Sequence, residues 1–76
     1  MLYTKVVRCD IRVSIVGGAG RVGLPLALVL AKNGFNVQII DLDYKKIELI
    51  NKSKMPFSET GAQEILKNLP VGCLNA

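Results

Sequence analysis

The sequence predicts an α/β fold organised around a parallel sheet, and three observations support this prediction. Two short segments rich in β-branched residues, 11–16 and 35–40, are separated by one helix-length segment, and a glycine-rich turn precedes that helix. A helix-length crossover makes the strands that it joins parallel, and parallel sheets are covered by helices on both faces. Two strands cannot form such a sheet alone. We therefore expect the N-terminal portion of a doubly wound domain, which this chain leaves incomplete.

Length and composition fit one small folded unit. The chain has 76 residues, of which 50% are hydrophobic and 21% are charged. These values are far from the low hydrophobicity of disordered chains. Domains of about 60 residues bury only about 60% of their unfolded surface and are marginally stable. We expect residues 1–76 to be one N-terminal fragment of a domain, with the core of the fold in residues 11–69.

The first half of the chain predicts a strand and a helix. Residues 11–16 are short, β-branched and followed at once by glycine, which is typical of a strand. Residues 5–8 are a candidate for a further short edge strand. Leucine and alanine predict a helix over residues 21–33, and Gly34 ends it because glycine suits the left-handed position after a helix. This helix is hydrophobic nearly all round, so it needs partners on more than one side.

The second half predicts one strand and two helices. Residues 35–40 form the second strand, which stops at Asp41. Asp43 is a good N-cap for a helix over residues 44–52. A loop separates this helix from a third one over residues 61–68. The predicted order of elements is therefore β-α-β-α-α.

The glycine-rich turn contains the pattern G-x-G-x-x-G, with its glycines at Gly18, Gly20 and Gly23. The pattern follows a predicted strand, opens a predicted helix and lies in a strand-helix-strand unit, which is the setting of a dinucleotide-binding fingerprint. Gly18 would allow the sharp turn, Gly20 the approach of a pyrophosphate, and Gly23 close packing of helix and strand. The N–H groups and dipole at the start of the helix favour phosphate. The turn therefore predicts a Rossmann-type dinucleotide site.

Asp41 lies at the end of the second strand, where the fingerprint has its acidic residue. Its carboxylate would accept hydrogen bonds from the adenosine ribose and repel the 2′-phosphate of NADP, so NAD is the predicted cofactor. Lys45 and Lys46 lie nearby, and cations at this point can accept that phosphate. The plainer alternatives are an ordinary tight turn at the glycines and an Asp41 that only caps a loop.

Composition disfavours several functional classes. The formal net charge is +4, but the basic residues are scattered and not interleaved with aromatic ones, so nucleic acid is not a predicted partner. Without histidine the chain offers no imidazole base and no Cys/His zinc site, and no metal site is predicted. Residues 13–31 approach membrane-spanning length, but four glycines and Arg21 interrupt them. Cys9 and Cys73 are far apart in sequence and are expected to be reduced thiols, which favours the cytoplasm.

Residues 13–27 read Val-Ser-Ile-Val-Gly-Gly-Ala-Gly-Arg-Val-Gly-Leu-Pro-Leu-Ala and resemble the N-terminus of the UDP-glucose/GDP-mannose dehydrogenases. The glycine fingerprint that runs directly into Val-Gly-Leu-Pro-Leu-Ala is more specific than the fingerprint itself. The resemblance continues through Asp41 and Lys46. Residues 55–61, Met-Pro-Phe-Ser-Glu-Thr-Gly, are similar to the family's Pro-Ile-Tyr-Glu-Pro-Gly loop. The resemblance as a whole covers residues 11–69, nearly the whole chain.

The resemblance implies a cytoplasmic, NAD-dependent enzyme that oxidises the C6 alcohol of a UDP-sugar to a carboxylate, for surface polysaccharide synthesis. It suggests UDP-glucose or a UDP-N-acetyl-hexosamine as substrate. The cofactor-binding positions that it implies are Gly18, Gly20, Arg21, Val22, Gly23, Asp41, Lys46 and Glu59. Asp41 falls on the ribose-binding acid, Lys46 on a basic residue near the adenosine, and Glu59 on the glutamate of the loop beside cofactor and active site. No catalytic residue is implied, because the family's cysteine, lysine and sugar-binding domain lie downstream.

Three positions depart from the family pattern. Thr60 stands where the loop usually has proline, Ala62 where it has leucine, and Arg21 replaces a common tyrosine or histidine. The departures suggest a subgroup that acts on N-acetylated amino sugars. The fragment alone is expected to be inactive and to bind a nucleotide sugar only with the missing C-terminal part.

Two further interpretations stay open. A non-catalytic nucleotide-binding or interaction module would use the same residues, and its open sheet edges would form a homo-oligomer or pair with a complementing chain. A flavin-type or short-chain-type enzyme fits less well. Flavoproteins more often end the second strand in glutamate, and the short-chain glycine spacing does not fit residues 17–23.

Overall fold

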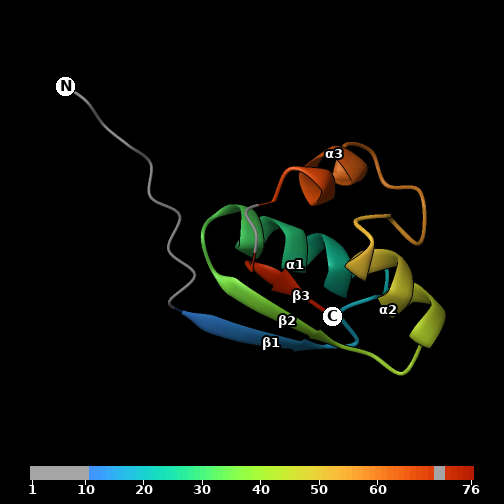
Figure 1. The fold of residues 1–76 in the computed structure, drawn as a ribbon, viewed down its shortest axis with the longest axis horizontal. Helices are drawn as coiled ribbons and strands as arrows, with labels where there is room; N and C mark the ends of the chain where they lie inside the picture. The colour runs from blue at the N-terminus through green and yellow to red at the C-terminus, as the bar shows by residue number, and fades with distance from the viewer. Residues whose placement is uncertain (1–10, 70–71) are drawn as a thin grey trace.

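The computed structural model describes residues 11–69 and 72–76, which form a small α/β unit (Figure 1). The elements in chain order are β1 (Arg12–Val16), α1 (Gly23–Lys32), β2 (Asn36–Ile40), α2 (Tyr44–Asn51), α3 (Ala62–Lys67) and β3 (Leu74–Asn75). The strands are parallel and lie in the order β1-β2-β3. This succession is that of one half of a Rossmann sheet, so the predicted fold class is confirmed. The candidate strand at residues 5–8 lies outside the described residues.

The strands and helices predicted within residues 11–69 are all present, with ends shifted by one or two residues. The start of α1 moves to Gly23, because Arg21 and Val22 belong to the turn before it. β3 is an element that the sequence analysis did not predict. It has only two residues and is defined by its pairing with Val37 and Gln38 of β2. The observed order is therefore β-α-β-α-α-β.

The helices cover one face of the sheet (Figure 1). The chain steps from β1 to β2 to β3 in one direction, and right-handed crossovers then place both connections on the same side. Burial of the strands alternates accordingly. Val37 and Ile39 of β2 are buried under α1, whereas Gln38 and Ile40 on the other face are exposed. The described residues leave that second face uncovered.

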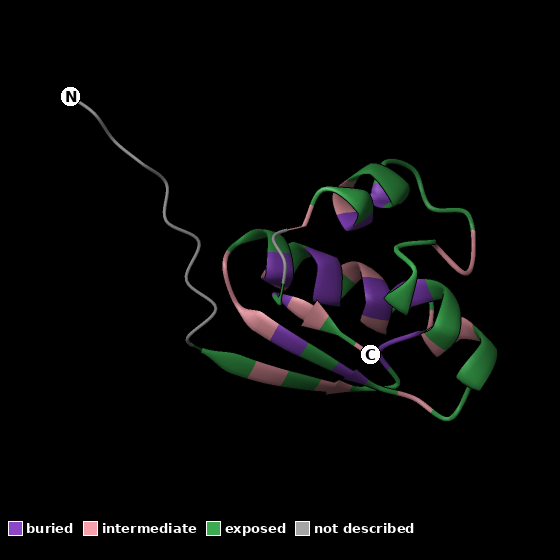
Figure 2. Cartoon of the chain, in the orientation of Figure 1, coloured by how far each residue is buried: buried purple, intermediate pink, exposed green. Residues whose placement is uncertain are grey.

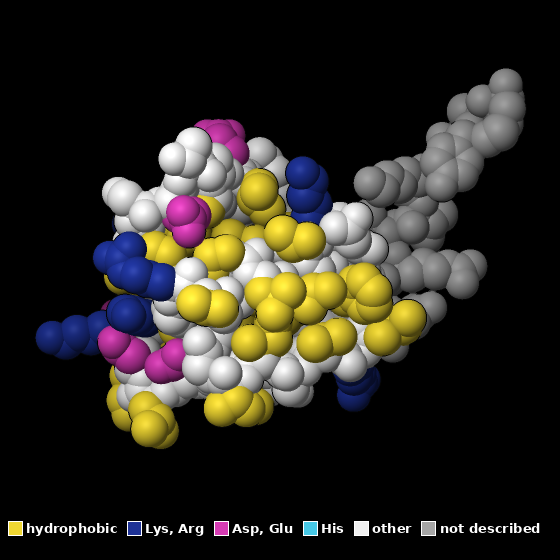
Figure 3. Space-filling view, turned by 180° about the vertical axis from the view of Figure 1, so that it is seen from behind, with side chains coloured by type: hydrophobic (Ala, Val, Ile, Leu, Met, Phe, Trp, Pro, Cys, Tyr) yellow, Lys and Arg dark blue, Asp and Glu magenta, His cyan; other side chains and the backbone are white. Residues whose placement is uncertain are grey.

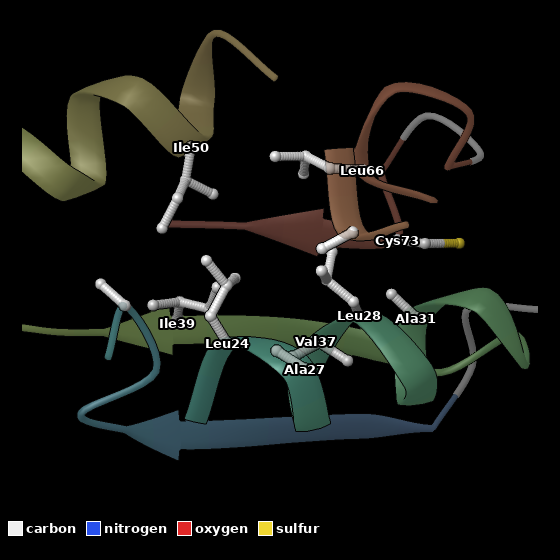
Figure 4. Packing of buried hydrophobic residues seen from close by; sticks show 11 residues of the cluster. Leu24, Ala27, Leu28, Ala31, Val37, Ile39, Ile50, Leu66 and Cys73 are labelled. Carbon is white, nitrogen blue, oxygen red and sulfur yellow. The ribbon is translucent and has the colours of Figure 1, made fainter. Parts of the chain in front are cut away.

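The core lies between α1 and β2 and extends to α2 and α3 (Figures 2 and 4). The buried positions of α1 are Leu24, Ala27, Leu28 and Ala31, which form one stripe along the helix. Ile50 of α2 and Leu66 of α3 complete the core on the side of β3. Within the described part of the chain, α1 is thus buried on one side only, because no second layer of structure covers its outer residues.

The outer side of α1 is apolar. Figure 3 shows a band of hydrophobic side chains across one face of the molecule. Leu26 and Val29 on α1 are each 52% exposed, and Val22 at the start of the helix is 85% exposed. Contiguous apolar surface of this kind marks interaction sites in soluble proteins. The hydrophobic character that we predicted all round the helix is therefore present, and part of it, at Leu26 and Val29, faces outward.

Cys73 corrects the expectation for the two cysteines. Its side chain is fully buried, and it is disulfide-bonded rather than a free thiol. Cys9 lies outside the described residues. Separation along the sequence does not decide whether cysteines pair, because the fold sets their distance in space. The prediction of two free thiols was therefore wrong for Cys73, and it gives no support for a reducing compartment.

None of the helices in residues 11–69 and 72–76 has the length and hydrophobicity needed to cross a bilayer. The same residues bring together no group of three or more side chains of the types that hold metal ions.

Candidate functional site

The glycine-rich loop, residues 17–22, connects the end of β1 to the start of α1. Its first residue, Gly17, has a φ of 77°, in the left-handed region that favours glycine. Gly17 N–H donates to the Ile40 carbonyl oxygen of β2 at 2.7 Å, and Gly20 N–H donates to the Gly17 carbonyl oxygen at 3.1 Å. The sharp turn therefore occurs at Gly17, one residue before the position that we expected from the fingerprint. The doubled glycine in the sequence was the available signal.

Two of the fingerprint glycines are required by packing. A Cβ on Gly18 would lie 2.9 Å from the Ile15 carbonyl oxygen and 2.9 Å from Cγ2 of Ile39. A Cβ on Gly23 would lie 2.5 Å from the Gly17 carbonyl oxygen and 2.9 Å from the Gly18 Cα. The start of α1 thus lies directly on the backbone that leaves β1, and only glycine permits this approach.

Gly20 differs from the other two, because its outer side is open. A Cβ there would meet only the Gly17 carbonyl oxygen, at 3.4 Å. The fold therefore tolerates a side chain at Gly20, but such a side chain would fill the space over the loop. Open space over the loop backbone is what a phosphate group needs to approach the main chain.

The start of α1 offers donors to that space. The backbone N–H groups of Arg21, Val22 and Gly23 have no acceptor among the described residues, and the first turn of the helix contains no acidic side chain. Orphan N–H groups and the positive end of the helix dipole attract anions. The loop and the helix start together form a site suited to a phosphate or diphosphate.

Asp41, directly after β2, is bonded to the glycine-rich loop. Its Oδ2 accepts a hydrogen bond from Ala19 N–H at 3.1 Å, and its Oδ1 accepts one from Asp43 N–H at 2.9 Å. The hydrogen bond from Asp43 N–H, and then that from Ala19 N–H, hold the pKa of Asp41 below its ordinary value. Burial opposes this lowering, and the nearby charge of Lys46 adds a smaller lowering effect. The carboxylate is therefore charged at neutral pH and fixed beside the loop. Lone pairs on both oxygens remain for a further donor.

Lys46 reaches this region from α2. The helix begins with Asp43 as its N-cap, as predicted, and the Asp43 carboxylate accepts a hydrogen bond from Lys46 N–H at 3.2 Å. The Lys46 charge acts on Asp41 closely enough to lower its pKa. Asp41 and the first turn of α2, which carries Lys46, are therefore connected through Asp43 after the end of β2, and Lys45 is exposed.

Glu59 belongs to a separate loop, residues 53–60, between α2 and α3. Residues 55–60 and Gln63 line an open cavity of about 600 Å³. Within the described residues, the Glu59 side chain makes no hydrogen bond or ion pair with the glycine-rich loop. The two loops meet instead through Arg21, whose guanidinium carbon lies 5.0 Å from the centre of the Phe57 ring. No sequence signal identified Phe57.

The comparisons with known proteins agree with this geometry. Residues 11–75 match the NAD binding domain of the UDP-glucose/GDP-mannose dehydrogenase family. A GDP-mannose 6-dehydrogenase from Pseudomonas syringae pv. tomato is 42% identical over 64 residues, which are 83% of this chain. A UDP-N-acetyl-D-mannosamine dehydrogenase from Methanococcus maripaludis is 33% identical over 58 residues, 76% of this chain. An uncharacterized protein from Methanocaldococcus jannaschii, MJ1054, is 40% identical over 55 residues, 72% of this chain.

The matched region is a small part of these relatives. It spans 14% of the length of each dehydrogenase and 6% of MJ1054. No solved structure matches the chain. The family match nevertheless covers both the glycine-rich loop and Asp41, the two parts that the fold brings together. The chain therefore belongs to the UDP-glucose/GDP-mannose dehydrogenase family, and its residues 11–75 correspond to the NAD-binding domain of that family.

Proposed function

We propose that this chain is the NAD-binding part of a nucleotide-sugar 6-dehydrogenase, which oxidises the C6 alcohol of a UDP-sugar to a uronate for surface polysaccharide synthesis. The observation that carries the proposal is the open space over Gly20, next to the N–H groups at the start of α1 that have no acceptor among the described residues. The charged carboxylate of Asp41, at the end of the neighbouring strand, supports it.

Each site residue has a part in the proposed binding of NAD. The diphosphate lies over Gly20 and receives hydrogen bonds from the backbone of Arg21, Val22 and Gly23. Gly18 and Gly23 keep the loop and helix close enough to form this surface. Asp41 accepts hydrogen bonds from the adenosine ribose hydroxyls. NAD supplies the hydride acceptor, and these residues bind it and fix its orientation.

Lys46 and Glu59 complete the proposed set. Lys46 holds a positive charge beside Asp41, at the adenosine end of the site. Glu59 stands on the wall of the cavity in residues 53–60, on the side of the molecule where Arg21 meets Phe57. We propose that Glu59 borders the bound cofactor, through the contact between its loop and Arg21.

The substrate class is proposed from the relatives and from three departures in sequence. The two named dehydrogenases act, by their names, on GDP-mannose and on UDP-N-acetyl-D-mannosamine. Arg21, Thr60 and Ala62 differ from the usual family pattern, and we propose that they mark a form for a UDP-N-acetyl-hexosamine. UDP-glucose is the other substrate that the resemblance to the family suggests. The NAD requirement of such a reaction favours the cytoplasm as its location.

A second candidate function is a non-catalytic nucleotide-binding or interaction module. The observations that favour it are the uncovered face of the sheet and the exposed hydrophobic side chains of α1. Under either function the exposed side of α1 can receive another polypeptide surface, from a second copy, from a complementing chain or from a further part of the same protein. Assays of NAD binding and of self-association on the same preparation distinguish the two.

We expect Asp41→Ala to reduce the preference for NAD over NADP. The substitution removes ribose hydrogen bonds to a charged group, worth about 1.5–3 kcal/mol each, and the repulsion of the 2′-phosphate. NAD affinity should fall about tenfold or more, while NADP affinity stays level or rises. Asp41→Asn removes the charge and keeps the shape of the side chain, so its main effect should be an NADP affinity higher than that of the wild type. Isothermal titration calorimetry with both cofactors measures the effect.

Glu48→Gln is the matched control for the Asp41 variants. Glu48 is an exposed carboxylate whose ion pair with Lys52 is long, 3.9 Å, so its charge can be removed without touching the loop. A wild-type chain that binds NADP as tightly as NAD would contradict the role given to Asp41.

The isolated 76-residue chain is expected to self-associate and to show no dehydrogenase activity. It has no histidine that could act as a base, and Cys73 is disulfide-bonded, so it is not available as a thiol nucleophile for oxidation to the carboxylate. Exposed Leu26 and Val29 should drive association. Sedimentation velocity measures self-association. The absorbance of NADH, followed with NAD and a set of UDP-sugars, measures dehydrogenase activity. Leu26→Lys should shift the chain toward monomer. A stable wild-type monomer that turns over a UDP-sugar would overturn both expectations.

A further inference from the structure

Arg21 lies where two loops of the molecule meet. It directly follows Gly20, the open position of the glycine-rich loop. Its guanidinium carbon is 5.0 Å from the ring centre of Phe57, which belongs to residues 53–60. A cation within about 6 Å of a ring centre is attracted to the aromatic face. The contact therefore fixes a long, charged side chain directly after the open position Gly20.

The loop that carries Phe57 is itself held in place. Gln63 of α3 accepts a hydrogen bond from Met55 N–H at 2.9 Å and donates one from Nε2 to the Ser53 carbonyl oxygen at 2.8 Å. Phe57 is half-buried and packs against the hydrophobic core. The ring is thus a firm support for Arg21.

Stacking on the ring leaves the donors of Arg21 available. The side chain is exposed and makes no ion pair or hydrogen bond with the described residues. A guanidinium presents five N–H donors in a planar fork, which suits two oxygens of a phosphate group. The N–H groups at the start of α1 follow directly in sequence. Side chain and backbone therefore offer donors to one anionic ligand.

We propose that Arg21 is a side-chain ligand of the diphosphate bound at this site, and that Phe57 is its positioning residue. The proposal rests on the proposed function, because it assigns a ligand group to the same nucleotide site. NAD and a nucleotide sugar both carry a diphosphate, so the chemistry is shared by two sources. A guanidinium that is already stacked loses little freedom when it binds, which favours affinity.

The test uses the full 76-residue chain and isothermal titration calorimetry with ADP-ribose, UDP and adenosine. Arg21→Gln should weaken ADP-ribose binding about tenfold and leave adenosine binding unchanged. It should also make ADP-ribose affinity less dependent on salt, because one phosphate contact is lost. Arg21→Lys keeps the positive charge but lacks the planar fork of donors, so its ADP-ribose affinity should lie between those of the wild type and Arg21→Gln. Lys67→Gln removes an exposed charge at the end of α3 and should change none of these values.

Phe57→Leu tests the positioning role separately. In the wild type, the ring should shift the NMR signals of the Arg21 Cδ protons upfield, and the variant should lose this shift while the amide spectrum stays native. ADP-ribose binding should weaken several-fold. An Arg21 signal that is the same with and without the ring would overturn the positioning role of Phe57.

The ligand arms separate the remaining outcomes. A loss confined to ADP-ribose assigns Arg21 to the cofactor diphosphate, and a loss confined to UDP assigns it to the nucleotide sugar. If Arg21→Gln binds ADP-ribose with the same affinity as the wild type, this inference is overturned, and the proposed function is unaffected. A folded wild type that does not bind ADP-ribose overturns the proposed function and the inference together.

Discussion

Replacing Gly23 by alanine is expected to lower the free energy of unfolding by about 3 kcal/mol or more, at the upper end for an overpacked site. The added Cβ would lie 2.5 Å from the Gly17 carbonyl oxygen and 2.9 Å from the Gly18 Cα. Both are backbone atoms, so no rotamer change can relieve the overlap. α1 would have to move away from the end of β1 and would pull buried Leu24 from its place over the sheet. Urea unfolding followed by circular dichroism measures the loss.

Gly20→Ala is the matched control for this prediction. The same methyl group at Gly20 meets one atom, at 3.4 Å, which is ordinary van der Waals contact. Its unfolding midpoint should stay at the wild-type value or rise slightly, since alanine restricts the unfolded chain more than glycine does. Equal midpoints for Gly23→Ala and Gly20→Ala would show that the close approach of α1 to the loop does not contribute to stability.

Gly20→Val is expected to have its large effect on ligand binding instead. A Cβ at Gly20 meets only one atom, the Gly17 carbonyl oxygen at 3.4 Å, so we expect the folded loop to accept valine. The branched side chain would then occupy the open space in which we place the diphosphate. NAD affinity should fall by about 1–3 kcal/mol, which is roughly 5- to 150-fold in Kd. Calorimetric titration with NAD measures the change, and the far-ultraviolet circular dichroism spectrum should stay that of the wild type.

Adenosine provides an internal control for Gly20→Val, because it has no phosphate and should bind wild type and variant equally. Wild-type NAD affinity in a folded Gly20→Val protein would rule out the glycine-rich loop as a phosphate site. Together with Gly23→Ala, the result separates glycines that the fold needs from the glycine that the ligand needs.

The positions of the strands and helices were predictable because short-range chemistry marks their ends. The glycines after β1, the turn at Gly34 and the N-cap Asp43 lie at boundaries that the structure also has. Parallel pairing of β1 and β2 followed from the helix between them. These inferences depend on neighbours along the chain, which a sequence displays directly.

Contacts between distant segments were not predictable in the same way. β3 is two residues long, too short to show any periodicity, and only its pairing with Val37 and Gln38 defines it. The contact of Arg21 with Phe57 depends on the path of residues 53–60, which Gln63 fixes through two hydrogen bonds. The turn at Gly17 escaped the fingerprint because the fingerprint begins one residue later.

The glycine-rich loop is bonded to the end of β2 twice, from Gly17 N–H to Ile40 and from Ala19 N–H to Asp41. A ligand held by the loop therefore also holds the β1–β2 pair, and it binds the native chain but not the unfolded one. By mass action, a ligand at a hundred times its Kd adds about 2.7 kcal/mol to apparent stability, a large share of the total for a small domain. The supply of cofactor in the cell would thereby set the lifetime of this protein against proteolysis. Depletion of the cofactor would then lower the amount of the protein as well as the occupancy of its site.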